Sequence, residues 1–392
     1  MVKGANAVVR LDEMKLQVSA PDNLQYTVKQ AITVLNKLGD KYGNSRISYD
    51  KEHKIQNIDV YIYDKFGDKI DHFKRKDFSD VSAADGFSLF NDDRVLRHSY
   101  TPVSYPYTIH TSYEVATSDT GFFPPWYFLS NYRVSVEKSH YEIAYSTLEL
   151  KPEIKEHNLE KLDFNKIEVP GRIIYKAKNI PAISYEELSP SFRDVVPRLS
   201  VRMKNFSLKG EYGEAENWKE LGNWMNTALL KDRDELPEET IIKAKELVEG
   251  VSDNLEKAKI IYKYVQDNTR YISVQIGIGG WKPISAIDVD LVKYGDCKGL
   301  SNYTYALLKA VDVTAYYTVI YAGKDKIDFL EDFAALQGNH AILAIPYEGG
   351  YYWIDCTSQV HPFGFVGDFT DDRKALIITP NGGCLLYTSD AA

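Results

Sequence analysis

The spacing of apolar residues changes near residue 210 of this 392-residue chain. Before that point apolar and polar residues alternate, as around Ile58 and Val60, which is typical of half-buried strands. After it, apolar residues such as Trp218, Leu221 and Met225 repeat every three or four positions, which is typical of a helix. Only strand-like segments precede residue 210, and helices followed by strands come after it. We therefore expect an all-β domain and then an α+β domain.

The first part, residues 1–195, is predicted to be a β-sandwich. A turn at 65–68 between two alternating runs indicates a hairpin. Strand-like alternation also occurs at 9–18, 58–62, 105–115, 132–136, 140–146 and 172–177, with turn residues between the segments. Many short strands separated by turn signals favour a sandwich.

The second part, residues 215–380, follows an expected linker at 196–214. Pro237 opens one predicted helix, and Asp253 with Glu256 has the spacing of a capping box at the start of the next. A short strand at 271–276, a glycine-rich turn and a helix after Cys297 follow. Strands are expected at 315–321, 341–345, 351–354 and 374–378.

The last residues, 381–392, allow two interpretations. Asn381-Gly382-Gly383 is a hairpin signal, so a partner strand should follow. The sequence that follows also resembles translated sequencing-adapter sequence, and we expect a truncated or artefactual tail there. A genuine final strand is the alternative.

Composition limits the classes of partner. Hydrophobic content of 44% and charged content of 26% are typical of a soluble globular protein. The net charge of −9 without a basic stripe argues against nucleic acid. The sequence has no apolar run of about 18 residues for a transmembrane segment and no signal peptide in its first 11 residues. Three cysteines do not make a disulfide framework.

Cys297 is the first candidate for chemistry. It precedes an apolar run with helical spacing, which places it at a helix N-terminus. The helix dipole and the free N–H groups there favour a thiolate and can also donate to an oxyanion. A small, buried structural cysteine is the alternative.

His340 and Asp355 complete a possible triad. His340 opens one apolar strand and Asp355 ends another, with a hairpin expected between them at 346–350. A histidine beside a thiol acts as general base, and an acid on its second nitrogen fixes the tautomer. A solvated loop histidine is the alternative for His340.

Zinc is a minor alternative for the same residues. The available donors are Cys297, His340, Asp355, Cys356 and His361. Cys356 follows a strand residue, so its side chain should point away from that of Asp355. We therefore expect no metal and no cofactor.

Several motifs resemble those of the transglutaminase-like superfamily, which has a papain-like thiol triad. They are Tyr-Gly-Asp-Cys-Lys-Gly-Leu-Ser (294–301), Gly-Asn-His-Ala (338–341) and Trp-Ile-Asp-Cys-Thr (353–357). The segment 271–281 is similar to that of Gram-negative envelope proteins in which a β-sandwich domain of unknown function precedes the thiol domain. Pro124-Pro125-Trp126 and 134–139 resemble that sandwich.

The resemblance implies roles and a location. Cys297 is then the nucleophile, His340 the base and Asp355 the orienting acid, in a papain-like cysteine protease fold. A second oxyanion donor is expected from Gln275 or from the indole of Trp281, although each has a structural role as its alternative. Such proteins reside in the periplasm or cell envelope. They are usually longer at the C-terminus, so we expect this chain to be truncated after the thiol domain.

These observations predict a thiol enzyme that acts on peptide or protein amides through a thioester. Water as acceptor gives a peptidase or amidase, and an amine gives a transglutaminase. A catalytically silent scaffold that binds peptide or glycan is the alternative.

Overall fold

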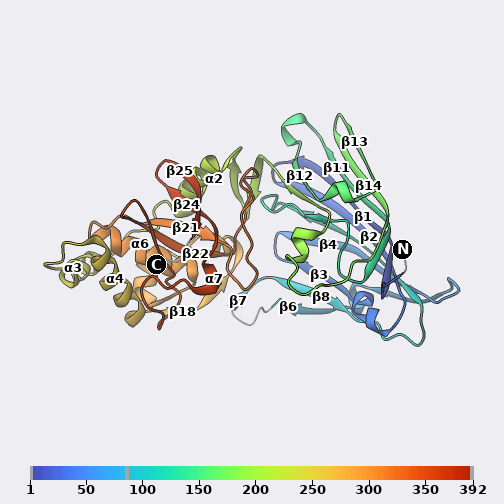
Figure 1. Cartoon of the computed structure of the whole chain (residues 1–392), viewed down its shortest axis with the longest axis horizontal. Helices are drawn as coiled ribbons and strands as arrows, with labels where there is room; N and C mark the ends of the chain where they lie inside the picture. Colours follow the sequence, from blue (N-terminus) through green and yellow to red (C-terminus); the bar gives the residue numbers. More distant parts are fainter. Residues whose placement is uncertain (1–2, 84–87, 389–392) are drawn as a thin grey trace. The chain divides into compact units, whose positions relative to one another are not determined.

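The computed structural model describes residues 3–83 and 88–388, without the side chains of 88–91, Val274 and Gln275. The chain divides into two compact units (Figure 1). Unit 1 comprises Met1–Ala83 and Asp92–Tyr212, and unit 2 comprises Ala84–Asn91 and Gly213–Ala392. Among the described helices, none is both long and apolar enough to cross a membrane.

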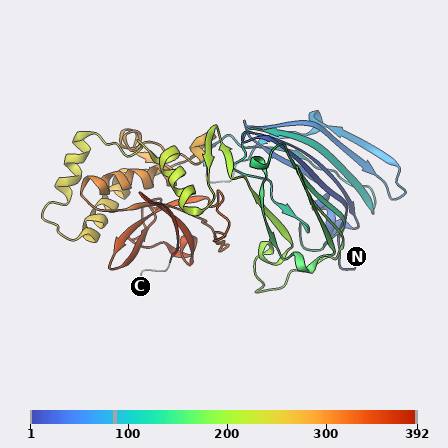
Figure 2. The ribbon, with the colours of Figure 1, turned by 90° about the horizontal axis from the view of Figure 1, so that it is seen from above.

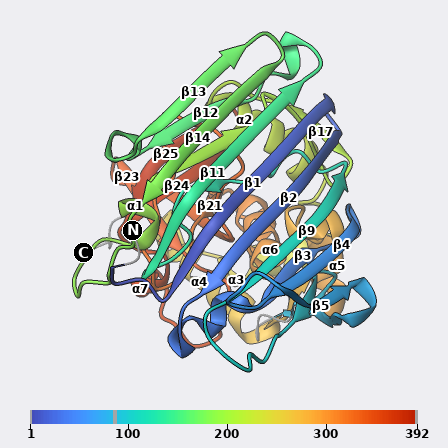
Figure 3. The same cartoon turned by 90° about the vertical axis from the view of Figure 1, so that its right-hand side faces the viewer.

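Unit 1 is built on an eight-stranded sheet, whose strands Figure 3 shows side by side. In spatial order they are β13 (Phe164–Val169), β14 (Arg172–Ile180), β11 (Val134–Tyr145), β1 (Ala7–Ala20), β2 (Asn23–Val34), β9 (Tyr107–Thr117), β4 (His53–Tyr63) and β5 (Lys69–Lys74). Strands β1 and β11 pair in parallel, and the other neighbours are antiparallel.

Two three-stranded sheets accompany the large one. They are β10 (Trp126–Tyr127), β15 (Arg198–Arg202) and β12 (Glu153–His157), and β3 (Ser45–Tyr49), β8 (Arg94–His98) and β6 (Ser79–Ser82). Val60 and Ile109 of the large sheet share one buried cluster with Ile47 of β3 and Leu96 of β8. Burial of these inward-facing side chains holds the sheets together, which confirms the predicted all-β sandwich.

The predicted hairpin at 65–68 joins β4 to β5. The backbone N–H groups of Phe66 and Asp68 both donate to the Asp64 carboxylate, at 2.8 and 2.9 Å, so an aspartate side chain organises the turn. Short helical turns elsewhere in the unit are η1 (Lys37–Gly43), η2 (Arg75–Asp77), η3 (Leu148–Leu150), η4 (Leu159–Lys161) and α1 (Phe192–Val195).

Residues 196–214, expected as a linker, contain strands. Besides β15 they form β16 (Asn205–Leu208) and β17 (Glu211–Glu214), which pair with each other. Phe206 and Leu208 are buried, which explains why this segment is ordered.

Unit 2 carries helices and a five-stranded antiparallel sheet (Figure 2). The helices are α2 (Trp218–Trp224) with a π-helical continuation η5 (Met225–Leu230), α3 (Glu238–Leu247), α4 (Asn254–Asn268), η6 (Gly277–Gly280), α5 (Ala286–Val292), α6 (Cys297–Ala310) and α7 (Gly367–Thr370). The sheet order is β23 (Gly350–Ile354), β22 (His340–Tyr347), β21 (Tyr316–Ile320), β24 (Arg373–Thr379) and β25 (Gly382–Thr388).

Two small pairs join β18 (Arg270–Tyr271) to β20 (Tyr294–Gly295) and β19 (Ser273–Gln275) to β7 (Ser88–Asn91).

Helix α6 is the central element of unit 2. Its Leu300, Tyr303 and Leu307 lie in one buried cluster with residues of α3, α4 and α5 and with Leu343 of β22. Asp253 caps α4 by accepting from the Glu256 N–H at 2.9 Å, as the sequence predicts. These helices and the sheet confirm the predicted α+β domain.

The final strand of the sheet follows the turn that the sequence predicts at 381–383. β25 pairs with β24 from Thr379↔Gly382 to Arg373↔Thr388, and the side chain of Thr388 is buried. The residues up to 388 that were predicted as a truncated or artefactual tail thus form a sheet edge. Residues 389–392 of that tail lie outside the described part of the chain.

Candidate active site

The start of α6 places Cys297 at a helix N-terminus, as the sequence predicts. Asp296 is the N-cap, and its Oδ1 accepts from the Gly299 N–H at 2.9 Å. Its other oxygen pairs with the Lys298 ammonium, and both side chains are buried. The Cys297 side chain therefore begins the helix on a fixed backbone, where it is 5% exposed.

The hairpin between β22 and β23 brings His340 and Asp355 together. Glu348 and Gly349 both have positive φ, 49° and 82°, and they join the pair Tyr347↔Gly350 in a two-residue turn. The imidazole Nε2 of His340 lies 2.9 Å from Oδ2 of Asp355. The predicted hairpin thus sets the two side chains in hydrogen-bond contact.

His340 lies between Asp355 and Cys297. Its imidazole forms a hydrogen bond with the Cys297 thiol as well as with the carboxylate. Because Nε2 faces Asp355, the nitrogen left for the thiol is Nδ1. The structure therefore brings all three predicted residues into one chain of contacts.

The charges of this chain favour a thiolate and an imidazolium. Burial alone raises the pKa of the Cys297 thiol, but the charge of His340 and its hydrogen bond outweigh burial, so the pKa is lowered. Burial alone lowers the pKa of His340, but Asp355 and Cys297 raise it to about 10. Burial disfavours the charge on Asp355, yet His340 and Thr357 keep its pKa below the ordinary value.

Thr357 and Tyr262 hold Asp355 in place. The backbone N–H and the hydroxyl of Thr357 both donate to Oδ1, at 2.9 and 2.6 Å, which leaves Oδ2 for His340. The Tyr262 hydroxyl donates to the Asp355 carbonyl at 3.1 Å. The ring of Phe369 packs edge-on against the imidazole, with centroids 5.4 Å apart. The carboxylate is thus oriented before any substrate binds.

Cys356 points away from this chain of contacts, as strand alternation predicts. Its thiol is buried against α6, where Ser301 and Thr304 form hydrogen bonds with it, and burial raises its pKa to about 12. His361 is exposed and packs against Phe365. In the portion of the chain with described side chains, no three His, Cys, Asp or Glu residues are grouped to hold a metal ion.

The two expected oxyanion donors are less well defined. The backbone of Gln275 ends β19, and its side chain lies outside the described residues. Trp281 follows η6, and its backbone N–H donates to the Ile278 carbonyl at 2.8 Å. Its side chain is partly exposed. Both assignments therefore stay predictions.

Two tyrosines that sequence reasoning missed lie near Cys297. Burial and the Cys297 charge raise the pKa of Tyr271 to about 12 and that of Tyr317 well above its ordinary value. Tyr317 belongs to an unbroken apolar strand, so no sequence pattern distinguishes it from core. Thr357 was also missed, although its position two residues after Asp355 is a signal for a side-chain turn.

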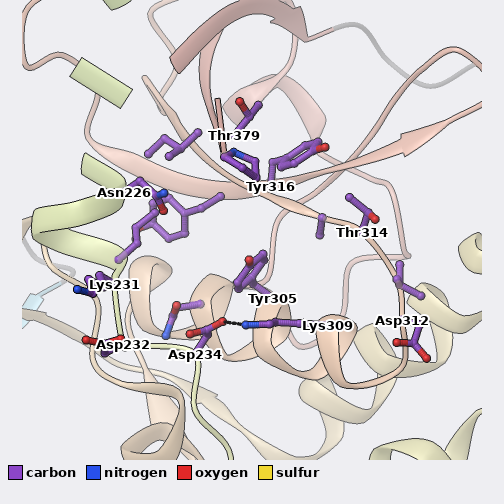
Figure 4. Close-up of a pocket in the computed structure, with 17 residues that line it drawn as sticks. Asn226, Lys231, Asp232, Asp234, Tyr305, Lys309, Asp312, Thr314, Tyr316 and Thr379 are labelled. Atoms are coloured by element: carbon purple, nitrogen blue, oxygen red, sulfur yellow. Dashed lines mark hydrogen bonds and ion pairs between the residues drawn. The ribbon is translucent and has the colours of Figure 1, made fainter. Parts of the chain in front are cut away.

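A separate cavity of about 670 Å³ lies in unit 2 (Figure 4). Its walls come from Tyr305 and Lys309 of α6, Tyr316 of β21 and the segment after η5. The Lys309 ammonium donates to Asp234 at 2.6 Å across one wall. None of Cys297, His340 and Asp355 lines it, so this cavity is distinct from the triad.

Comparison with known families assigns both units. Residues 20–184 match the model of a domain of unknown function with a solved structure, DUF3857. Residues 243–357 match the model of the transglutaminase-like superfamily, and this range includes Cys297, His340 and Asp355. No curated protein matches the sequence.

One solved structure shows the same fold. A candidate protease from Parabacteroides distasonis superposes with a TM-score of 0.68 at 16% identity, covering 98% of this chain and 72% of that one. A candidate cysteine protease from Cytophaga hutchinsonii matches with a TM-score of 0.26 at 11% identity, over 93% of this chain and 86% of that one. The chain therefore contains a segment that matches the DUF3857 domain, followed by a segment that matches the transglutaminase-like superfamily.

Proposed function

We propose that this protein is a thiol enzyme that breaks amide bonds of peptides or proteins by acyl transfer. The observation that carries the proposal is the position of His340, in contact with the Cys297 thiol on one side and with Asp355 on the other. This is the order nucleophile, base and orienting acid that nucleophilic catalysis requires. In this proposal Cys297, His340 and Asp355 are the catalytic residues.

The reaction has two stages. The Cys297 sulfur attacks the amide carbonyl, a C–S bond forms, and the carbonyl oxygen takes the negative charge. His340 then gives its proton to the leaving nitrogen, the C–N bond breaks, and a thioester and an amine result. In the second stage His340 takes a proton from the incoming acceptor, which attacks the thioester; the C–S bond breaks and the thiolate leaves, which restores the thiolate–imidazolium pair. Asp355 stabilises the imidazolium in both stages.

The oxyanion is best stabilised at the start of α6. The first N–H groups of a helix have no partner within the helix, and the dipole there favours negative charge. The Cys297 N–H is one donor in this proposal. Gln275 or the indole of Trp281 supplies the second, since both lie between β18 and α6 in the chain.

The acceptor defines the type of enzyme. Water produces a carboxylic acid and makes the protein a peptidase or amidase. A primary amine produces a new amide and makes it a transglutaminase. Mass spectrometry of a proteome-derived peptide library, incubated with and without a lysine-containing peptide, distinguishes shortened peptides from cross-linked ones.

The place of action that we propose is the periplasm or the cell envelope, from the resemblance of the sequence to Gram-negative envelope proteins. Immunodetection of the native protein in periplasmic, membrane and cytoplasmic fractions tests it. Recovery in the cytoplasmic fraction alone contradicts this location.

Iodoacetamide alkylation with peptide mapping tests the reactivity of the thiol. We expect Cys297 to react near neutral pH because its pKa is lowered. The buried Cys356, whose pKa is about 12, should stay unmodified, and the exposed Cys384 serves as an internal reference.

Two results together would rule out a thiol enzyme. If Cys297 reacts no faster than Cys384 near pH 7, and Cys297→Ala leaves peptide turnover intact, the protein is not a thiol enzyme. A catalytically silent domain that binds peptide or glycan then becomes the better interpretation.

A further inference from the structure

A row of polar side chains crosses the inner face of the large sheet in unit 1. The strand register places Ser139 of β11 opposite Asp12 of β1, Asp12 opposite Gln30 of β2, and Gln30 opposite Thr111 of β9. These four strands are neighbours in the sheet (Figure 3). The four residues, here called the polar row, thus form one continuous line across the sheet.

The next row on the same face has a different character. It consists of Tyr141, Met14, Val28 and Tyr113, in the same strand order. Inward-facing positions of a sandwich are normally apolar, because a buried polar group loses its water. The polar row therefore departs from what the fold alone requires.

Hydrogen bonds hold the polar row in a fixed arrangement. Gln30 Nε2 donates to Asp12 Oδ1 at 3.1 Å. The Trp126 indole donates to the Ser139 hydroxyl at 3.1 Å, and the Thr111 and Ser45 hydroxyls are 3.1 Å apart. Asp12 is 8% exposed, and in the described part of the chain it pairs with no cation.

A cavity of about 330 Å³ opens onto three of the four residues of this row. Asp12, Gln30, Thr111 and Tyr113 belong to the wall formed by the large sheet, and Trp126 of β10 lines another part of the cavity. Gln30, Thr111 and Tyr113 are only partly buried, although they occupy inward-facing positions. The polar row therefore faces open space inside the sandwich instead of packed side chains. Asn44 and Arg46, both exposed, also line the cavity and mark its outer end.

The chemistry of these walls selects a class of ligand. A carboxyl, an amide and a hydroxyl on neighbouring strands offer several donors and acceptors on one wall, while aromatic rings cover apolar C–H groups on another. This combination matches a molecule with many hydroxyls and an apolar face. The guanidinium of Arg46 at the outer end disfavours a cation. The volume suits one sugar ring.

We propose that the sandwich binds a neutral, monosaccharide-sized sugar in this cavity, with the polar row as its hydrogen-bonding wall. The site lies wholly within unit 1 and does not depend on the thiol chemistry of unit 2. The carboxyl of Asp12 and the amide of Gln30 would share two adjacent hydroxyls of the sugar, and Thr111 a third. Trp126, held by its bond to Ser139, would cover the face of the ring.

Saturation-transfer NMR on the full chain tests the proposal. The probes are D-glucose, D-galactose and N-acetyl-D-glucosamine, each at millimolar concentration, with n-butylamine as a cationic probe. We expect at least one sugar to receive magnetisation. The variants Gln30→Leu and Thr111→Val should weaken its binding by about tenfold each, because a buried hydrogen bond to the ligand is lost. The control Ser112→Ala, on the opposite face of β9, should change it by less than about twofold.

Three results overturn the proposal. The first is no transfer to any of the three sugars, and the second is binding of n-butylamine alone. The third is a sugar signal that Gln30→Leu and Thr111→Val leave unchanged, because the sugar then binds elsewhere. If these variants unfold, as judged by circular dichroism, Thr111→Ser and Trp126→Phe replace them. Thr111→Ser should retain binding and Trp126→Phe should weaken it, and equal binding by both contradicts the site.

Discussion

Two buried carboxyl groups, one in each unit, have opposite charge preferences. Asp355 ends β23 in unit 2 and is 7% exposed, and Asp12 lies in β1 of unit 1 and is 8% exposed. Burial raises the pKa of Asp12 from 3.8 to about 7, with only the Gln30 amide opposing it. Burial acts on Asp355 in the same direction, but His340 and Thr357 lower its pKa.

The difference shows that the partner, and not the depth, sets the charge of a buried acid. An imidazolium stabilises a carboxylate by Coulomb attraction and a hydrogen bond together, and a neutral amide supplies only the second. Unit 2 therefore keeps a buried carboxylate paired with an imidazolium. Unit 1 keeps an acid that is about half protonated at pH 7, where an ordinary aspartate is ionised.

The largest expected effect comes from removing the charge of Asp355. Asp355→Asn preserves the shape of the side chain but no longer stabilises the His340 imidazolium, so the Cys297 thiolate also loses its partner. We expect turnover of the fastest library peptide to fall by about 10³- to 10⁴-fold, as for other triads that lose the acid. Kinetics at pH 7 on the purified variant measure this loss.

Asp12→Asn is the matched control for that experiment, since it removes the same group at equal depth in the other unit. It should leave peptide turnover within about twofold of the wild type. A large loss of turnover in Asp12→Asn, or none in Asp355→Asn, contradicts the assignment of Asp355 as the orienting acid.

The second effect is the pH dependence of folding stability that Asp12 contributes. Its folded pKa, about 7, is raised above the ordinary 3.8, so its contribution is fully present below about pH 4 and is lost as pH rises to 7. Asparagine does not titrate. Relative to wild type, the free energy of unfolding of Asp12→Asn should therefore increase by about 3 kcal/mol from pH 4.5 to pH 8, because only the wild type loses stability over this range.

Urea unfolding of both proteins at the two pH values measures this difference. The lowered pKa of Asp355 places the loss of its own contribution below about pH 4, outside this range, so the control is Ser112→Ala, which changes no titratable group and should keep a constant difference from wild type. A flat difference for Asp12→Asn would show that its carboxyl is ionised in the folded state at low pH.

The polar row also explains what the sequence could not predict about unit 1. The runs at 132–136 and 140–146 look like two strands because Ser139, which points inward, interrupts the apolar alternation. They form the single strand β11. Asp12 interrupts β1 in the same way, next to a bulge after Val9. The parallel pairing of β1 with β11 joins residues far apart in the chain, and no local pattern encodes it.

More of the candidate site than of the large sheet in unit 1 could be predicted from the sequence. Cys297, His340 and Asp355 each stand beside a local signal, a helix start or a strand end, and the short hairpin between β22 and β23 fixes two of them. Tyr317 has no such signal, because its position beside Cys297 depends on tertiary contacts. Helix α5 was missed as well, since seven residues are too few to show a clear helical period.

Thr357 gives the smallest expected effect and the finest test of how Asp355 is held. Thr357→Val removes the hydroxyl that donates to Oδ1 at 2.6 Å and leaves the backbone N–H in place. The pKa of Asp355 should rise, because one hydrogen bond to its charged form is lost. Turnover should fall by about tenfold, the value of one buried hydrogen bond to a charged group. The acid limb of the pH–rate profile should move to higher pH.

The pH profile separates positioning from mere structural support. Thr357→Ser, which retains the hydroxyl, should restore both the rate and the acid limb, and Thr314→Val, at an exposed threonine of the same unit, should alter neither. If Thr357→Val lowers the stability but leaves the acid limb in place, Thr357 supports the fold without tuning Asp355. In that case the lower pKa of Asp355 compared with Asp12 is explained by the His340 imidazolium and not by Thr357.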